Sequence, residues 1–164
     1  MRAPAGTAES PTKDLQHFLT FLRKGNPGPN SHVVLLGLKL FDTPELLKAI
    51  NKGFAYRTFE RFQRNIVLPV ESVMLLVNIP RRTLTRRKQE GRFAPEESDR
   101  LVRASRVYGK ALELFEGNIT AASNWLRTPQ RGLGGEVPLV VAQTDVGSRE
   151  VERLLGRLEH GVFT

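Results

Sequence analysis

From residue 43 onward, the hydrophobic positions recur every three to four residues, the spacing that gives an α-helix one buried face. Proline or an acidic residue opens most of these segments and glycine follows several of them, which are common start and stop signals of helices. In the first segment we expect Thr43 to be the N-cap, with Pro44 and Glu45 in the first turn. The pattern predicts an all-α fold, with helices over residues 43–52, 54–66, 69–77, 80–90, 95–115, 121–126, 138–142 and 144–160.

The residues before this region follow a different pattern. Residues 1–31 are rich in Pro, Gly and small polar residues and are predicted to form a loose N-terminal tail. Within that tail, only residues 15–22 have the pattern of a short amphipathic helix. The run from Val33 to Leu38 is apolar and partly β-branched, which fits either one short strand paired with its twin in a dimer or the start of a buried helix.

Residues 68–77 and 80–90, which cover two of the predicted helices, have the proportions of a helix-turn-helix, with two short helices around a tight turn. Asn78 stands in that turn, where a residue that tolerates positive φ is needed. The positions expected to hold the two helices at a steep angle are all apolar: Val73, Val77, Ile79 and Leu84.

The second of these helices carries many basic and polar side chains and has little to bury. Arg is the commonest bidentate reader of guanine in the major groove, and Lys and Thr contact phosphates well. We therefore interpret it as a recognition helix; the alternative is a solvated basic face with no partner. The expected DNA-binding residues are Arg81, Arg82, Thr83, Thr85, Arg86, Arg87, Lys88 and Arg92.

The distribution of charge supports this interpretation. The formal net charge is +8, and residues 1–92 carry 16 Lys and Arg against 7 Asp and Glu, whereas residues 93–164 carry 9 against 10. The whole positive excess therefore lies in the part that contains the helix-turn-helix. Binding to an anionic partner there should weaken steeply with salt, and the neutral remainder suggests a second kind of partner.

Little in the sequence points to catalysis. The chain has no cysteine, which removes disulfides, thiolate nucleophiles and cysteine-based metal sites. His17, His32 and His160 are scattered and are interpreted as surface or half-buried side chains rather than metal ligands. No serine elbow, phosphate-binding loop or dinucleotide motif is present. We predict a protein that is not an enzyme, with no cofactor and no metal, and with no membrane span, located in the cytoplasm.

The C-terminal third contains an ordered series of motifs: W-L-x-x-P at 125–129, L-G-G-x-x-P-L at 133–139, and T-x-x-G-x-x-x-V-x-x-x-L-x-R-L-x-x-G-V at 144–162. Together with residues 83–87, 91–93 and 97–101, this series resembles the Xre–MbcA–ParS antitoxin family, the partners of RES-domain toxins. The resemblance covers roughly residues 33–164.

The resemblance implies a type II antitoxin that binds and blocks a RES-type, NAD-degrading toxin. It also implies repression of the antitoxin's own operon through the helix-turn-helix, with operator DNA as second partner, and a homodimer within a larger toxin–antitoxin complex. The chain would then divide into the tail (1–31), a helix-turn-helix DNA-binding and dimerisation domain (32–117) and a toxin-binding domain (118–164). A stand-alone helix-turn-helix regulator, whose C-terminal helices dimerise or sense a ligand, is the alternative.

By the same resemblance, the toxin-binding residues fall into a scaffold and an inhibitory helix. The scaffold is Trp125, Leu126, Pro129, Gly134, Gly135, Pro138 and Leu139, and the inhibitory surface is the helix that ends at Gly161. On and after that helix we expect toxin contacts from Glu152, Arg153, Arg157, Glu159, Gly161, Val162 and Thr164; for Arg153 and Arg157 the alternative is a solvated face. Because a pocket for the NAD⁺ pyrophosphate should be basic, an acidic group among these is the best candidate to enter it. Gly147 and Gly156 weaken this helix, which is understandable if something packs closely against them.

Overall fold

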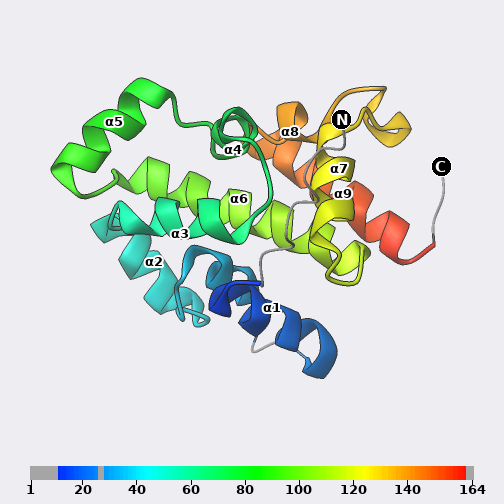
Figure 1. The fold of residues 1–164 in the computed structure, drawn as a ribbon, viewed down its shortest axis with the longest axis horizontal. Coiled ribbons are helices and arrows are strands. Elements are labelled where there is room, and N and C mark those ends of the chain that lie inside the picture. Colours follow the sequence, from blue (N-terminus) through cyan, green and yellow to red (C-terminus); the bar gives the residue numbers. More distant parts are fainter. Residues whose placement is uncertain (1–10, 26–27, 162–164) are drawn as a thin grey trace, which may run out of the picture.

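The computed structural model describes residues 11–25 and 28–161 of the chain. Helices make up the fold, and α6 runs through its centre (Figure 1). In chain order the elements are α1 (Lys13–Lys24), the 3₁₀ helix η1 (Ser31–Leu36), α2 (Thr43–Lys52), α3 (Arg57–Asn65), α4 (Val70–Val77), α5 (Arg81–Glu90), α6 (Pro95–Leu114), α7 (Ile119–Arg127), the 3₁₀ helix η2 (Arg131–Leu133), α8 (Pro138–Val141) and α9 (Asp145–Glu159). Within the described ranges there is no strand, which confirms the all-α expectation.

The helix boundaries follow the capping signals of the sequence. The sequence allows either Thr144 or Asp145 as the cap of α9, and the structure has Thr144, whose hydroxyl accepts a hydrogen bond from the N–H of Gly147 at 2.9 Å. The predicted cap of α2 is one residue off. Asp42 rather than Thr43 is the N-cap, because its carboxylate accepts from the N–H of Glu45 at 3.2 Å, and Thr43 is already helical.

The strand interpretation of residues 33–38 is wrong. Ser31–Leu36 is the 3₁₀ helix η1, and Gly37 ends it with a φ of 74° while its N–H donates to the carbonyl of Val34. All four residues from Val33 to Leu36 are buried, so η1 is covered on every side. It packs against α1, α3 and α6, which leaves no room for a strand partner and explains why the run has no polar face.

The prediction of a loose tail over residues 1–31 is wrong for residues 13–24, which form α1 and belong to the folded unit. Leu15 and Phe18 of α1 are each 2 % exposed. Asp14 forms an ion pair with Arg61 of α3, 2.6 Å between the Nη2 and Oδ1 atoms, and also accepts from the amide of Asn65 at 2.9 Å. The amphipathic helix expected at 15–22 is thus confirmed, and its apolar side chains are part of the core.

One continuous core joins the first helix to the last. It is built around α6, whose closest neighbours are α9, η1 and α7. The Tyr108 hydroxyl on α6 lies 2.8 Å from that of Ser123 on α7, a buried polar link between the two halves of the chain. No helix in the described ranges is both long and apolar enough to cross a bilayer.

Candidate nucleic-acid and partner interfaces

The two helices of the predicted helix-turn-helix, α4 and α5, are joined by residues 78–80. Asn78 adopts the left-handed conformation expected of it, with φ 51° and ψ 45°, and its N–H donates to the carbonyl of Leu75. This single residue turns the chain between the helices without glycine. The four apolar positions that the sequence assigned to the packing between them are all buried: Val73, Val77, Ile79 and Leu84.

The outer face of α5 is basic and open to solvent. Arg82 and Lys88 are exposed and form no ion pair with any described residue. Arg81 and Arg86 have acidic neighbours at 3.7 Å and 3.9 Å, but these are exposed side chains whose attraction is weak in water. Thr85 is exposed as well, and Thr83 is half-buried. α5 therefore presents several cations that an anionic partner can reach.

Arg87 differs from the other basic residues of α5, because it is turned toward α6. Its side chain is 19 % exposed, and its Nε donates to Glu97 Oε1 at 2.7 Å while Nη1 donates to Glu90 at 2.7 Å. Burial alone would raise the pKa of Glu97, but the hydrogen bonds from Arg87 and from the N–H of Ala94 outweigh it and hold that pKa below its ordinary value. Arg87 thus holds α5 against α6, a role different from the DNA contact that its sequence position predicts.

Arg92 lies just beyond α5 and is also engaged with the fold. Its Nη1 donates to the carbonyl of Gly53 at 2.6 Å, and its backbone pairs with that of Ala55 in an isolated bridge. The residue remains exposed, so the bond orients its guanidinium beside the end of α5.

In the C-terminal part, the scaffold residues divide by burial. Leu126, Pro138 and Leu139 are buried and Trp125 is half-buried, so these residues hold α7 and α8 in place. The loop between them contains η2 and is closed by the bridge between Gln130 and Glu136. The remaining scaffold residues, Pro129, Gly134 and Gly135, are exposed on that loop.

The two glycines of α9 have opposite surroundings. A Cβ on Gly147 would lie 1.7 Å from the carbonyl oxygen of Val141, so the close packing expected there is confirmed. A Cβ on Gly156 would meet nothing within 4 Å. Among the residues that the structure describes, no close packing accounts for that glycine.

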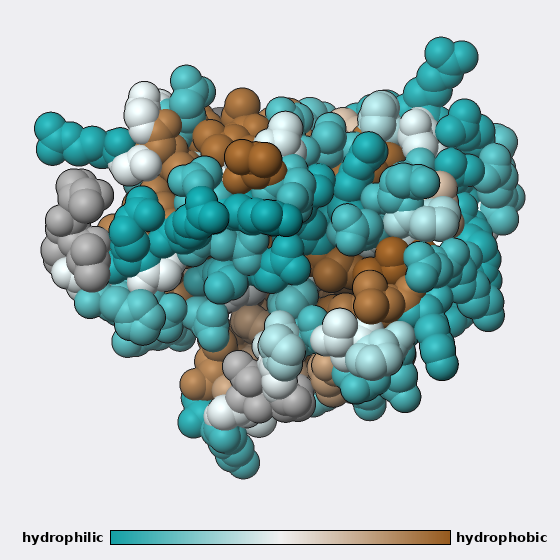
Figure 2. All heavy atoms as spheres, turned by 180° about the vertical axis from the view of Figure 1, so that it is seen from behind, coloured by the Kyte–Doolittle hydropathy of each residue, from teal (hydrophilic) through white to brown (hydrophobic). Residues whose placement is uncertain are grey.

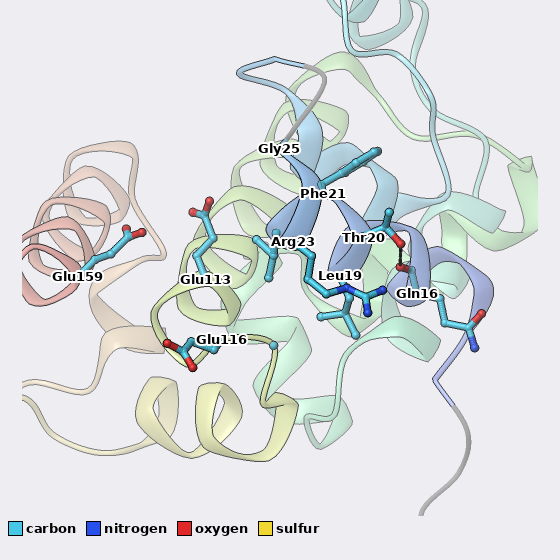
Figure 3. Close-up of a pocket in the computed structure, with 11 residues that line it drawn as sticks. Gln16, Leu19, Thr20, Phe21, Arg23, Gly25, Glu113, Glu116 and Glu159 are labelled. Atoms are coloured by element: carbon cyan, nitrogen blue, oxygen red, sulfur yellow. Dashed lines mark hydrogen bonds between the residues drawn. The ribbon is translucent and has the colours of Figure 1, made fainter.

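The acidic candidates of α9 are also placed differently from one another. Glu152 is bound to Arg106 of α6 at 2.8 Å, and its side chain is only 13 % exposed, so it is held by the fold. Glu159 is exposed at the end of α9 and lines a cavity of about 910 Å³, together with Glu113, Glu116 and residues of α1 (Figure 3). Burial, reinforced by Glu159, raises the pKa of Glu113. Three glutamates and one arginine, Arg23, are the charged residues that line this cavity, so its lining is acidic on balance.

The other residues predicted for the inhibitory helix differ in their exposure and in their hydrogen-bond partners. Arg153 is exposed and pairs with Glu150. Arg157 is half-buried, and its Nε has no hydrogen-bond partner within the described chain. Gly161 is exposed with a φ of 72°. Val162 and Thr164 lie outside the described residues.

His32 is not the surface or half-buried histidine that the sequence suggested. It is 5 % exposed in η1, and burial, together with the nearby cations Arg106 and Lys110, lowers its pKa to about 3. It is therefore neutral at physiological pH. In the part of the chain that the structure describes, no three acidic, histidine or cysteine side chains are grouped to hold a metal ion.

Two known families match this chain over adjoining segments. Residues 45–106 match the Antitoxin Xre-like helix-turn-helix domain, and residues 110–161 match the Antitoxin Xre/MbcA/ParS C-terminal toxin-binding domain. The first match contains α4 and α5, and the second contains α7, α8 and α9.

Three curated proteins, each described as antitoxin Xre, are similar over most of their length. The chain is 38 % identical to the one from Yersinia enterocolitica, over 79 % of this chain and 88 % of the relative. It is 32 % identical to the one from Photorhabdus laumondii, over 74 % and 82 %, and 31 % identical to the one from Pseudomonas putida, over 74 % and 79 %.

Proposed function

Because the chain belongs to the Xre/MbcA/ParS family of antitoxins, we propose that it neutralises a RES-type, NAD-degrading toxin and represses the operon that encodes the pair. Two features built on one core support this proposal. The first is the exposed basic helix α5, which follows a turn made by Asn78 in the left-handed conformation. The second is a C-terminal part that matches a toxin-binding domain. The proposed role is binding, of one protein and one DNA site, and not catalysis.

The DNA-binding half of the proposal is supported by the exposure of α5. In a helix-turn-helix the second helix enters the major groove, where Arg contacts guanine and Lys contacts phosphate. Arg82 and Lys88 are the best candidates, since neither is engaged by a described acidic residue. We propose Arg81, Thr85 and Arg86 as further contacts, and a homodimer that presents two such helices to a two-fold symmetric operator.

The toxin-binding half is supported by the placement of α9 at the surface of the C-terminal part. Of the acidic groups proposed to enter the toxin's basic pocket, Glu152 is occupied by Arg106, whereas Glu159 is exposed. We therefore propose Glu159 as the described acidic residue that approaches the toxin. Trp125 and the buried scaffold residues act by holding α9 in position.

The toxin-binding half is tested by co-expressing the chain with a RES-domain toxin of the same genome, with the affinity tag on the toxin. We expect the two proteins to co-purify and the cells to keep their NAD⁺. Toxin expressed alone should deplete NAD⁺. If NAD⁺ falls equally with and without this chain and no complex is recovered, the proposed partner is wrong.

The DNA-binding half is tested by measuring affinity for the operon's own promoter DNA at a series of salt concentrations. Replacing Arg82 and Lys88 together with alanine should weaken binding and reduce the slope of log K against log salt by about 1 per lost phosphate contact. Arg153→Ala on α9 is the control, because it removes an exposed cation outside the helix-turn-helix. Equal losses for the double variant and the control would contradict a recognition role for α5.

A further inference from the structure

Three exposed apolar side chains lie around the turn between α8 and α9, where the C-terminal part meets the helix-turn-helix. They are Leu75 of α4 (38 % exposed), Val140 of α8 (45 %) and Val146 of α9 (72 %). α4 packs against α8, and α8 against α9, and Figure 2 shows a group of apolar side chains at the upper edge of the molecule, the edge at which α4 and α8 lie in Figure 1. We call these three residues, with the half-buried Met74, the seam patch.

The seam patch borders a pocket with a polar rim. The pocket has a volume of about 420 Å³ and is lined by Met74 and Leu75 of the seam patch together with Ile79, Gln143, Glu71 and Arg81, whereas Val140 and Val146 are not part of its lining. An apolar centre within a polar rim is the usual composition of a protein-binding hot spot. Single exposed apolar residues are ordinary on a protein surface, but a group of them beside a pocket indicates an interface.

The backbone under the patch is held by hydrogen bonds that join the two parts of the chain. The Asn78 amide donates to the carbonyl of Gln143 at 3.0 Å, and Arg103 donates to the same carbonyl at 3.4 Å. Arg100 in turn donates to the carbonyl of Asn78 at 3.1 Å. These bonds fix α4 relative to the α8–α9 turn, so a partner meets a preformed surface and loses little free energy in ordering it.

We propose that the toxin docks on the seam patch with an apolar side chain in the pocket, so that its binding surface extends from the C-terminal part onto α4 of the helix-turn-helix. The occupant is assigned to the toxin because Val140 and Val146 lie within residues 110–161, the segment that matches the toxin-binding domain. This inference rests on the proposed function. It adds Leu75, Met74, Val140 and Val146 to the residues that bind the toxin.

The experiment uses the full chain co-purified with the tagged toxin and follows the lifetime of the complex on the resin after dilution. Val146→Glu and Leu75→Glu each place a charge in the patch and should shorten the lifetime about tenfold, the effect of losing a hot-spot residue. Leu47→Glu is the matched control, since Leu47 is 53 % exposed on α2, outside the patch. Circular dichroism of each free variant checks that it has kept its fold.

Three results would overturn the inference. The first is a lifetime equal to that of the wild type in both patch variants, with the fold intact. The second is a patch variant that turns the free protein from dimer to monomer in analytical ultracentrifugation but still binds the toxin. That result would mean that a second copy of the chain, and not the toxin, covers the patch. In the third, the wild-type pair itself fails to co-purify, and the proposed function falls as well.

Discussion

At the scale of single residues, the bond between Arg87 and Glu97 separates a structural cation from the exposed cations of α5 that we propose to contact DNA. Removing the charge of Glu97 with Glu97→Gln should lower the free energy of unfolding at pH 7 by about 1–2 kcal/mol, because a charge-assisted hydrogen bond is lost from a largely buried pair. Arg82→Ala, which breaks no described ion pair, should change it by less than about 0.5 kcal/mol. Urea unfolding of the three proteins measures both values.

The same pair predicts a dependence on pH. Since the pKa of Glu97 is lowered in the folded protein, the carboxylate contributes stability above its ordinary pKa, and this contribution is lost as the pH falls through the folded value. The difference between the wild type and Glu97→Gln should therefore be full at pH 7 and should close in acid, below about pH 4. A difference that is the same at both pH values would mean that the substitution acts through packing.

At the scale of an element, the two glycines of α9 provide a matched pair of substitutions. Gly147→Ala drives a Cβ against the carbonyl of Val141, so α8 must move and we expect a loss of about 1–3 kcal/mol. Gly156→Ala meets open space and should stabilise the helix by about 0.5–1 kcal/mol. The melting temperatures of the two variants measure these opposite effects. A lower melting temperature for Gly156→Ala would contradict the open space around Gly156.

The elements also show which structural features could be predicted from the sequence. The helices that begin with proline and an acid were predicted because capping is local, and the helix-turn-helix because a left-handed turn selects Asn78. η1 was ambiguous because residues buried on every side have no periodicity to distinguish helix from strand. The inward turn of Arg87 could not be foreseen, since its partner lies on the next helix.

At the scale of the whole molecule, α1 is part of the fold and not an appendage. Leu15 and Phe18 contribute to the same core as α6, and Phe18 lies against Gly109. Phe18→Ala should therefore cost about 3–5 kcal/mol, as for other buried aromatic residues. If α1 were a detached tail, the variant would unfold at the same urea concentration as the wild type.

The shared core also decides how the chain unfolds. Leu126, Val151 and Leu155 of the C-terminal part belong to the same cluster as the helix-turn-helix residues Val73 and Leu84, so removing residues 118–164 would strip apolar cover from α6. The boundary at 117/118 remains a prediction about function, and we expect the two parts to unfold as one cooperative unit.

Trp125 makes this expectation measurable, because it is the only tryptophan of the chain and lies in the C-terminal part. Its fluorescence reports on α7, whereas far-ultraviolet circular dichroism reports on all the helices together. In urea the two signals should change with the same midpoint and slope. A fluorescence transition at lower urea would mean that the C-terminal part opens first and that the hydrogen bonds from Asn78 and Arg103 to Gln143 do not couple it to the helix-turn-helix. In that case the C-terminal part would unfold independently, and its removal would separate the proposed toxin binding from the proposed DNA binding. If the two transitions coincide, as we expect from the shared core, point variants such as Val146→Glu are needed to separate them.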